Sequence, residues 1–409
     1  MDIALTGPSS SLLKAQVNIT GSKSESNRLL LLRALFPGLQ IANLSNSADT
    51  QVMQEGLLQK SGTVDIHHAG TAMRFLTAYF ASQPGKEVLL TGSQRMTERP
   101  IKVLVDALRS LGAEITYAEE EGYPPLQIKG KKLQQKATSL PANISSQYIS
   151  ALLLIAPSLE HGLELKLEGK ITSVPYIRMT LSLLNQVGIP NSFEGSDITI
   201  GPTDEITPKK LVVESDWSSA SYFYSIAALA APGSALVLSS YHEKSLQGDS
   251  VLKEIYKDFG VETRFEGHSI RLMRTEHKTP DFLEYDLANA PDIAQTIAVS
   301  CFGLGVGCKL TGLHTLKIKE TDRLLALQNE LGKLGADVEV TEDSLTLKPS
   351  TGIREDVSIA TYNDHRMAMA FAPLALRTRI RIADAGVVEK SYPDYWSDLQ
   401  ALGFGLREL

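Results

Sequence analysis

Residues 101–115 read IKVLVDALRSLGAEI, and this stretch shows the repeating element from which the chain is built. Ile101, Leu104, Leu108 and Leu111 recur at the three- and four-residue spacing of one helical face. Gly112 can end that helix and turn the chain into the apolar strand that follows. The stretch therefore predicts an amphipathic helix, a glycine C-cap and a strand.

The same pattern returns five more times along the chain. Clear copies occupy residues 176–193, 250–265 and 322–340, and weaker copies occupy 49–66 and 394–406. Most copies are about 70 residues apart, which indicates a repeat architecture. Strands are expected between these helices, at 87–90, 163–167, 235–238 and 309–311. Six copies predict six similar α/β units with helices packed on sheets, and a three-plus-three division gives two domains.

The composition is that of a globular protein that is not built to bind nucleic acid. A length of 409 residues favours two domains over one core. A hydrophobic content of 43% and a charged content of 21% are ordinary for such proteins. The net charge of -7 argues against a nucleic-acid partner, because phosphate backbones require a basic face.

The cysteines and the apolar stretches bear on where the protein works. Cys301 and Cys308 make neither a disulfide framework nor a zinc site, which fits a cytoplasmic protein. The N-terminal residues lack the pattern of a signal peptide. The longest apolar stretches, 149–156 and 226–231, are too short to span a bilayer, so they predict buried helices and no membrane association.

The stretch GSKSESNR, residues 21–28, follows a short apolar segment and opens an apolar run. A Gly-Ser turn into a helix presents unpaired backbone N–H groups, which favour an anion. Lys23, Ser24 and Arg28 add a point charge, a hydroxyl and a bidentate fork. The stretch therefore predicts a phosphate or carboxylate site, with a solvated helix start as the alternative.

Two further stretches in the first half of the chain could bind an anion. Gly70, in the turn HAGTAMR, would let a ligand approach the backbone closely, or it is needed for packing alone. Arg99 precedes Pro100 and is expected at the mouth of the helix that starts at Ile101. The alternative for Arg99 is an ordinary surface arginine.

A third group of polar residues precedes predicted buried helices. Ser145, Ser146 and Gln147 come directly before the apolar run, where they can cap the helix or donate to a ligand. Ser173 and Tyr176 repeat this arrangement one unit later.

The second half of the chain adds carboxylates. Asp292 precedes an apolar helix, where it is either the N-cap or, beside cations, a general base. Glu320 and Arg323 lie three residues apart, so they would share a face of one helix. The run KIKETDR that contains them could also be a solvated charged face.

Two more cations lie near the C-terminus. Asp364 is expected to cap a helix that has Arg366 in its first turn. A cation is disfavoured there by the helix dipole unless an anion binds, so Arg366 is an informative arginine. Lys390 precedes the last repeat.

Taken together, these stretches carry a family resemblance. The chain resembles the enolpyruvyl transferases, and among them the 5-enolpyruvylshikimate-3-phosphate synthase family. The matching motifs occur in the family order: GSKSESNR (21–28), AGTAMR (69–74), ERPI (98–101), SSQY (145–148), SVPY (173–176), PD (291–292), KIKETDR (317–323), YNDHRMAMA (362–370) and EKSYPDYW (389–396).

The resemblance implies an α/β (α+β) fold of two similar domains. Each domain would consist of three βαβαββ units, an inside-out α/β barrel, and two crossovers would join the domains. The first domain would span residues 21–214, and the second would span 1–20 and 215–409. The resemblance also implies that the domains close over the substrates, and that the protein is a monomer without a metal or an organic cofactor.

The reaction implied by the resemblance is part of the shikimate pathway of aromatic amino acid biosynthesis. The enolpyruvyl group of phosphoenolpyruvate is transferred to the 5-hydroxyl of shikimate 3-phosphate, and phosphate is released. Such a reaction needs a base at the hydroxyl, an acid at the methylene and cations on the anionic oxygens.

The resemblance also assigns residues to these roles. Asp292 is the expected base, and Glu320 is the expected proton donor, a role that Lys23 could share. The expected shikimate 3-phosphate site consists of Lys23, Ser24, Arg28, Ser145, Ser146, Gln147, Ser173, Tyr176, Asp292, Thr315 and Lys319. The expected phosphoenolpyruvate site consists of Lys23, Gly70, Arg99, Gln147, Arg323, Arg366 and Lys390.

Three positions depart from the family pattern. His68 stands where the family usually has Asn, Phe75 where it often has Pro, and Thr315 where it has Asn. None of the three removes a residue with an expected catalytic role.

Two other functions are alternatives. A UDP-N-acetylglucosamine enolpyruvyl transferase generally carries a Cys or an Asp in the loop before the first-domain Arg-Pro, and the loop GSQRMTERP has neither. A non-catalytic anion-binding module on the same scaffold could lose Asp292 or Glu320, whereas both are present.

Overall fold

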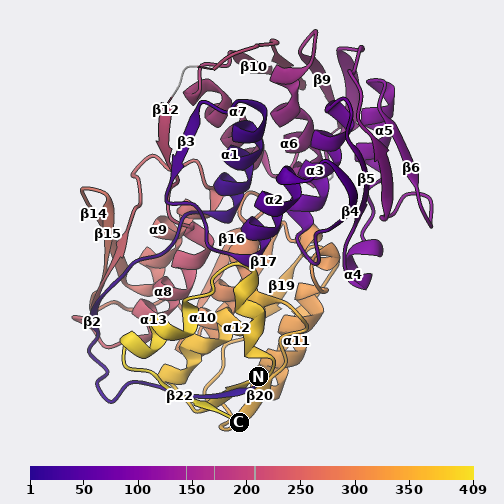
Figure 1. The fold of residues 1–409 in the computed structure, drawn as a ribbon. Coiled ribbons are helices and arrows are strands. Elements are labelled where there is room, and N and C mark those ends of the chain that lie inside the picture. Colours follow the sequence, from indigo (N-terminus) through magenta and orange to yellow (C-terminus); the bar gives the residue numbers. More distant parts are fainter. Residues whose placement is uncertain (144, 170, 207–208) are drawn as a thin grey trace. The chain divides into compact units, whose positions relative to one another are not determined.

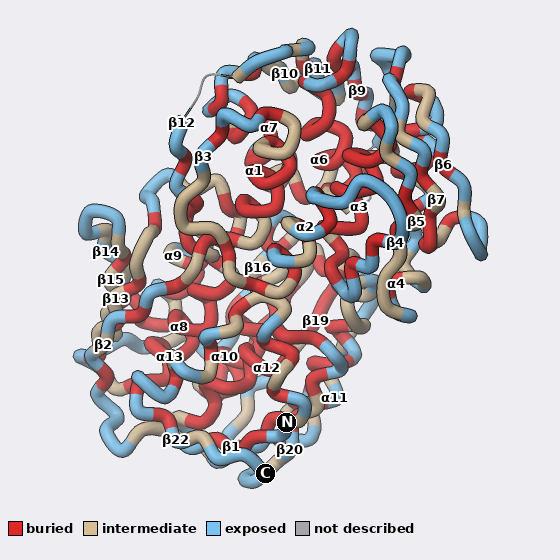
Figure 2. Tube along the Cα trace, in the orientation of Figure 1, coloured by how far each residue is buried: buried red, intermediate tan, exposed pale blue. Residues whose placement is uncertain are grey.

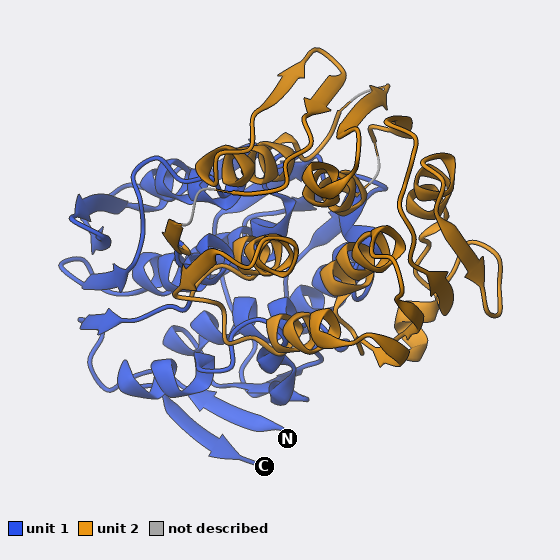
Figure 3. Ribbon diagram, turned by 45° about the horizontal axis from the view of Figure 1, so that its top comes forward, with its two compact units in different colours: residues 1–20, 214–409 blue, residues 21–213 orange. Residues whose placement is uncertain are grey.

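The computed structural model describes residues 1–143, 145–169, 171–206 and 209–409. These residues fold into two compact units. The larger unit consists of Met1–Thr20 and Glu214–Leu409, and the smaller unit consists of Gly21–Val213 (Figure 3). The chain therefore starts in the larger unit, builds the smaller unit in one excursion and then returns.

The described residues of the smaller unit form three sheets and their helices (Figure 1). Its strands are β3 (Leu39–Ala42), β4 (Ser61–Asp65), β5 (Glu87–Thr91), β6 (Glu114–Tyr117), β7 (Leu126–Lys129), β8 (Ala137–Pro141), β9 (Leu163–Glu168), β10 (Asn191–Glu194), β11 (Asp197–Ile200) and β12 (Lys209–Val212). Its helices are α1 (Lys23–Leu35), α2 (Ala48–Leu58), α3 (Gly70–Ser82), α4 (Gln94–Thr97), α5 (Lys102–Ser110), α6 (Ser146–Ile155) and α7 (Val174–Gln186). The sheet orders are β4-β5-β7-β6, β10-β11-β9-β8 and β12-β3.

The larger unit also contains three sheets. Its strands are β1 (Ile3–Thr6), β2 (Lys14–Val17), β13 (Ala235–Ser239), β14 (Val261–Glu266), β15 (Ser269–Arg274), β16 (Phe282–Asp286), β17 (Gly307–Thr311), β18 (Val338–Val340), β19 (Leu345–Leu347), β20 (Val357–Ile359), β21 (Ile380–Ile382) and β22 (Gly405–Glu408). Its helices are α8 (Trp217–Leu229), α9 (Leu252–Ile255), α10 (Ala294–Leu304), α11 (Arg323–Leu334), α12 (His365–Phe371) and α13 (Tyr395–Ala401). The sheet orders are β14-β15-β13-β2, β16-β17-β19-β18 and β20-β21-β1-β22.

The sheet β4-β5-β7-β6 shows the repeating unit most simply. Strands β4 and β5 are parallel and α3 connects them, then α5 leads into the antiparallel pair β6 and β7. The sheets β10-β11-β9-β8 and β16-β17-β19-β18 repeat this βαβαββ order with α6 and α10 as the connecting helices. The predicted strands at 87–90, 163–167, 235–238 and 309–311 are present as β5, β9, β13 and β17.

The weak repeat at 49–66 has a structural explanation. Helix α2 forms there, but the following strand β4 joins the neighbouring four-stranded sheet. The sheet that precedes α2 has two strands in the described part of the chain, β3 and β12, which pair in parallel. This unit therefore departs from the full βαβαββ pattern.

Long helices that are almost wholly buried form the interior of each unit. Helices α3 and α6 in the smaller unit, and α8 and α10 in the larger one, are buried along almost their whole length (Figure 2). Helices that are apolar on all sides are stable only when they are covered on all sides. The buried helices predicted at 149–156 and 226–231 are present, although α6 ends at Ile155 and α8 ends at Leu229. Among the described residues, no helix is both long enough and apolar enough to cross a membrane.

Glycines end two of the repeat helices as predicted. Gly260 follows the helical segment after α9 with φ of 73°, and Gly335 follows α11 with φ of 104°. This left-handed backbone is easily reached by glycine, and it turns each chain segment into the next strand.

Gly21, where the smaller unit begins, serves a different purpose. A Cβ atom at this position would lie 1.8 Å from the backbone oxygen of Asn43 and 2.9 Å from the side chain of Val213. The Asn43 side chain also donates to the Val213 carbonyl at 2.8 Å. The first and last residues of the smaller unit therefore lie together, with space for glycine alone.

Candidate functional site

Arg323, the first residue of α11, is the centre of a buried charge cluster in the larger unit. Its Nη1 lies 2.9 Å from Asp292, its Nη2 lies 2.8 Å from Glu320, and its Nε lies 2.6 Å from Asp364. Burial alone would lower the pKa of Arg323, but the carboxylates of Asp364, Glu320 and Asp292 outweigh it and raise that pKa. Glu320 and Arg323 were expected to share a face of one helix. They form an ion pair, but α11 begins at Arg323 itself, so Glu320 lies outside the helix.

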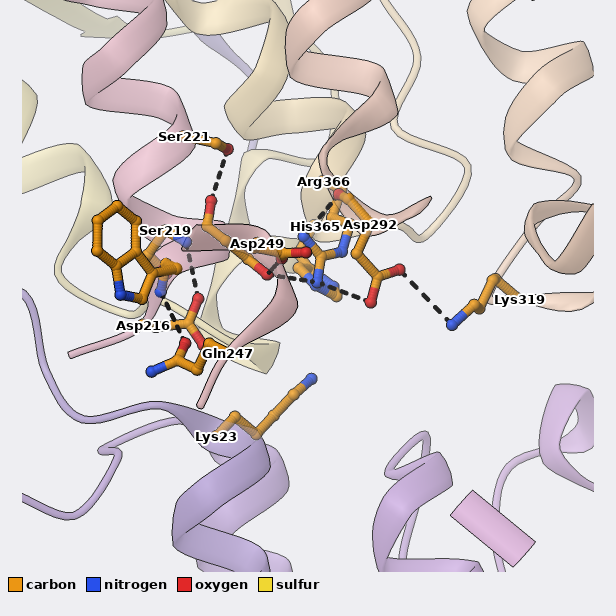
Figure 4. A network of polar contacts seen from close by, with 12 residues as sticks. Lys23, Asp216, Ser219, Ser221, Gln247, Asp249, Asp292, Lys319, His365 and Arg366 are labelled. Carbon is orange, nitrogen blue, oxygen red and sulfur yellow. Dashed lines mark hydrogen bonds and ion pairs between the residues drawn. The ribbon is translucent and has the colours of Figure 1, made fainter. Parts of the chain in front are cut away.

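Asp292 contacts two cations besides Arg323. Its carboxylate oxygens lie 3.5 Å from Lys319 Nζ and 3.5 Å from Arg366 Nη2 (Figure 4). It lies in the short 3-10 helix η4 (Pro291–Ile293) and does not cap α10, which was one interpretation of the sequence. Burial would raise the pKa of Asp292, but Arg366, Lys319 and Arg323 together hold it well below its ordinary value. The carboxylate is therefore ionised.

Asp364 and Arg366 occupy the start of α12, as predicted. Asp364 caps the helix by accepting from the Arg366 backbone N–H at 2.9 Å. The Arg366 side chain donates to the Asp292 backbone oxygen at 3.0 Å, so it points back into the cluster. Lys390 donates to the carbonyl of Asn363 at 2.5 Å, which places this fourth cation against the loop that leads into α12.

Asp249 is a member of the cluster that the sequence did not indicate. Ser218 Oγ lies 3.3 Å from Arg366 Nη2 and donates to the Asp249 carboxylate. Burial, followed by the charge of Asp292, raises the pKa of Asp249 to about 7, although Arg366 and Ser218 act in the opposite direction. Asp249 lies more than 30 residues from every other charged member of the cluster, so no local spacing could have identified it.

Lys319 and Thr315 supply further polar groups beside the cluster. Burial lowers the pKa of Lys319, although the Asp292 carboxylate partly offsets this effect. Thr315 lies in the short helix η5 (His314–Ile318), and its buried hydroxyl has no hydrogen-bond partner among the residues that the structure describes. A polar group of a bound molecule would satisfy this hydroxyl.

In the smaller unit, the predicted anion site lies at the start of α1. Lys23 is the first residue of this helix, and its Nζ lies 2.9 Å from the Asp49 carboxylate. The Ser24 carbonyl accepts a 2.8 Å hydrogen bond from Arg28 Nη1 one turn later. The helix therefore begins with a lysine and a hydroxyl group beside the positive end of the helix dipole.

Arg28 itself is buried and has several protein partners. Its Nε donates to Thr180 at 2.8 Å, and its Nη2 donates to Ser150 at 2.9 Å. The guanidinium carbon lies 5.4 Å from the ring centre of Phe75 and 5.9 Å from that of Tyr176. Burial lowers the pKa of Arg28 to about 10. The side chain therefore holds α1 against α6 and α7, in addition to any ligand contact.

Gly70, the first residue of α3, lies against the guanidinium of Arg99. A Cβ atom on Gly70 would lie 2.7 Å from Arg99 Nη1, so only glycine allows this approach without a shift. Arg99 was expected at the mouth of the helix from residue 101, but its guanidinium reaches the start of α3. Gln147 Nε2 donates to Thr71 at 3.2 Å at this same helix start. Backbone N–H groups, a guanidinium and an amide thus lie together at the start of α3, and all of them are donors that can bind an anion.

The serines ahead of α6 and α7 have different roles. Ser145 caps α6, where its hydroxyl accepts from the Gln147 backbone N–H at 3.4 Å. Ser146 is the buried first residue of the same helix. Ser173 stands at the N-cap position of α7 with φ of 53° and makes no capping hydrogen bond with its side chain. A non-glycine residue in this left-handed region is strained, which is typical of functional sites.

Each unit therefore presents cations at helix starts. The larger unit combines Arg323, Arg366 and Lys319 with several carboxylates, Asp292 and Glu320 among them, so it can bind an anion and move a proton. The smaller unit offers Lys23 and Arg99 beside helix N-termini. In the part of the chain that the structure describes, no group of three His, Cys, Asp or Glu residues is placed to hold a metal ion.

Comparison with known proteins identifies the family. Residues 58–399 match the family model of EPSP synthase (3-phosphoshikimate 1-carboxyvinyltransferase). The chain belongs to the EPSP synthase family. Two relatives from Bacteroides fragilis strains, both named 3-phosphoshikimate 1-carboxyvinyltransferase, are 44% and 45% identical to it. The matches cover 100% of this chain and 99% of each relative.

More distant relatives carry the same name. One from Photobacterium damsela subsp. piscicida is 37% identical over 96% of this chain and 97% of its own length. Solved structures of EPSP synthase from Acinetobacter baumannii superpose with a TM-score of 0.78 at 21% identity and cover both chains completely. The likeness confirms the predicted α/β class and the EPSP synthase fold of this family member.

Proposed function

We propose that this family member transfers the enolpyruvyl group of phosphoenolpyruvate to the 5-hydroxyl of shikimate 3-phosphate and releases phosphate. The observation that carries the proposal is the 44% identity, over the whole chain, to a protein named 3-phosphoshikimate 1-carboxyvinyltransferase. The cation-rich helix starts of both units support it, because both substrates are anions. The family match favours shikimate 3-phosphate over UDP-N-acetylglucosamine as the acceptor.

The proposed phosphoenolpyruvate contacts use the cations described above. Arg323, Arg366 and Lys390 bind its carboxylate side, since a guanidinium fork matches a carboxylate. Gly70, Arg99 and Gln147, together with Lys23, bind its phosphate. The support for this assignment is the close approach of Arg99 to the bare backbone of Gly70 at the start of α3.

The proposed shikimate 3-phosphate contacts lie on several elements. Hydroxyl groups, an amide and cations bind its phosphate and ring, and Arg28 also holds the helices that carry them. Thr315 supports the proposal through its buried hydroxyl, which a substrate oxygen would satisfy. The proposed residues are Lys23, Ser24, Arg28, Ser145, Ser146, Gln147, Ser173, Tyr176, Asp292, Thr315 and Lys319.

Asp292 is the proposed base. It takes the proton of the 5-hydroxyl as that oxygen bonds to the central carbon of phosphoenolpyruvate. Its surrounding cations lower its pKa, so the carboxylate is ionised but weakly basic. Substrate anions that bind Arg323, Arg366 and Lys319 would offset these positive charges and raise the basicity of Asp292. The charge of the substrates thus prepares the base.

Glu320 is the proposed proton donor to the methylene carbon, and Lys23 can share this role. Glu320 pairs with Arg323 at 2.8 Å. Once Arg323 binds the substrate carboxylate, Glu320 loses part of its ion pair, which favours its protonated form. Phosphate then leaves the tetrahedral intermediate, and the methyl carbon returns a proton to restore the vinyl group.

We also propose that the two compact units are the two domains of the enzyme. The smaller unit ends at Val213, one residue before the boundary expected from the sequence. Ser215 supports an end at this position, because its hydroxyl donates to the Ile19 carbonyl within the larger unit at 2.5 Å.

The test is phosphate release from phosphoenolpyruvate with shikimate 3-phosphate as the acceptor. The wild type is expected to turn over, and Asp292→Asn is expected to lose about 10²-fold or more in kcat. Asp337→Asn is the matched control, because Asp337 is exposed and pairs with Lys348 outside the cluster. The control should keep wild-type activity.

Other outcomes would reject the proposal. Turnover with UDP-N-acetylglucosamine and none with shikimate 3-phosphate would show the sister activity. Binding of both substrates in a calorimeter without phosphate release would show a non-catalytic binding module.

A further inference from the structure

Glu330 is a fully buried carboxylate on α11 that the chemistry above does not use. Its side chain has no exposed surface, although it lies on the same helix as Arg323. Seven residues, close to two helical turns, separate these two positions, so both side chains leave the same face of α11. Burying a carboxylate costs free energy unless hydrogen bonds or ion pairs compensate for the lost water.

Two partners of Glu330 lie in the loop that leads into α12. Its Oε1 accepts from the Tyr362 hydroxyl at 2.6 Å, and its Oε2 accepts from the Ala360 backbone N–H at 3.0 Å. A third donor, Lys333 Nζ, is 2.7 Å away and belongs to α11 itself. Two of the three donors therefore come from the loop, whose residues 360–363 we call the α12 entry loop.

The α12 entry loop is strained. Tyr362 and Asn363 both adopt positive φ, 53° and 55°, although neither is glycine. Consecutive non-glycine residues in this region persist only where their surroundings hold them. The loop then leads directly into Asp364, whose backbone N–H donates to the Thr361 carbonyl at 2.8 Å.

Helix α11 thus contacts both ends of the segment 360–364. At one end Glu330 binds Ala360 and Tyr362, and at the other Arg323 binds Asp364 at 2.6 Å. Between these two ends, the carbonyl of Asn363, a residue with positive φ, accepts a hydrogen bond from Lys390. The position of the α12 entry loop therefore decides where Asp364, Arg366 and Lys390 lie.

We propose that Glu330 is a positioning residue for phosphoenolpyruvate binding: by holding the α12 entry loop in its strained conformation, it places Arg366 and Lys390 for the substrate carboxylate. This inference rests on the proposed function for its substrate, but the loop contacts themselves do not depend on it. Lys333 supplies the built-in comparison, because it binds the same carboxylate from outside the loop and is 44% exposed.

The kinetic test uses Glu330→Gln and the milder Tyr362→Phe, with Lys333→Met as the control. Misplaced binding groups can cost up to about 10²-fold, so we expect KM for phosphoenolpyruvate to rise about 10-fold or more in both variants. KM for shikimate 3-phosphate should change less than about threefold, and Lys333→Met should match the wild type. Equal rises in both KM values, or a fall in kcat alone, would overturn the positioning role.

A rescue experiment separates strain from general damage. Glycine reaches positive φ without strain, and Lys390 uses the backbone carbonyl of Asn363, which glycine retains. Adding Asn363→Gly to Glu330→Gln should therefore recover most of the lost affinity for phosphoenolpyruvate. No recovery, with both proteins folded by circular dichroism, would contradict the proposal.

Hydrogen exchange tests the loop without any substrate. In Glu330→Gln, the amides of residues 360, 364 and 366 should exchange about 10-fold faster or more, with little change in Lys333→Met. Unchanged exchange at these amides overturns the inference even if the enzyme is active. If exchange is faster in Glu330→Gln but the wild type has no synthase activity, the role of Glu330 in holding the loop stands and the proposed function is rejected.

Discussion

The ion pair between Asp364 and Arg323 allows a quantitative prediction for Asp364→Asn. Asp364 is fully buried, and the two side chains approach to 2.6 Å. At that distance and an effective dielectric constant of about 20, the attraction is about 6 kcal/mol before desolvation is considered. Asn is also a good N-cap, so the substitution removes the charge and keeps the cap of α12.

The net loss is smaller than the attraction. Arg323 keeps Asp292 and Glu320 as partners, and removing one member of a buried pair typically costs about 3–5 kcal/mol. We therefore expect a loss of about 3 kcal/mol in the free energy of unfolding. For a folding unit of roughly 200 residues, this lowers Tm by about 6–12 °C.

Thermal denaturation followed by circular dichroism measures this shift. Asp337→Asn is the control, because it breaks an ion pair of similar length, 2.8 Å, between two exposed side chains. Such a pair contributes little, so its Tm should stay within about 1 °C of the wild type. Equal shifts in the two variants would refute the reasoning, because burial would then not decide what the charge contributes.

Two other substitutions test the site further. Burial raises the pKa of Asp249 from its ordinary 3.8 to about 7, so the stability of the folded protein falls as the pH rises from about 4 to about 7 and then stays level. Asp249→Asn stays neutral, and its Tm advantage over the wild type should be larger at pH 8 than at pH 5; an advantage independent of pH would contradict the raised pKa. Gly70→Ala would place a Cβ atom 2.7 Å from Arg99 Nη1, so Arg99 must shift. Steady-state kinetics should show KM for phosphoenolpyruvate rising about 10-fold with little change in Tm, whereas an unchanged KM would exclude Arg99 from the phosphate contacts.

The sequence predicted the helices, the strands and their repeat because these signals are local, whereas the βαβαββ order was implied by the family resemblance. The amphipathic pattern of α5, its glycine C-cap and the following strand all lie within fifteen residues, and the repeat multiplies that signal. The weak copy at 49–66 shows the limit of this approach. Its helix forms, but β4 pairs with β5 in another sheet, and a strand's partner is a long-range property.

The contacts within the site likewise divide into short-range ones, which the sequence indicates, and long-range ones, which it does not. The cap of α12 by Asp364 spans two residues and was predicted. Glu320 and Arg323 are three residues apart and were expected on one helix face; they form an ion pair, but Glu320 lies before the helix. The contact of Asp364 with Arg323 spans 41 residues, and that of Glu330 with Tyr362 spans 32. Neither had a signal in the spacing, because burial removes these charges from water only after α11 and α12 have packed.

Arg28 shows that a sequence motif can predict the kind of ligand without predicting which side chains contact that ligand. Its position in GSKSESNR predicted an anion contact, yet its guanidinium bonds to Ser150 and Thr180, which are 122 and 152 residues away. A buried guanidinium needs such partners, since an unpaired N–H in the interior is costly. Arg28 can therefore serve the anion site by fixing the helices around Lys23. The tertiary partners of each cation decide whether it contacts the ligand or positions the helices that do.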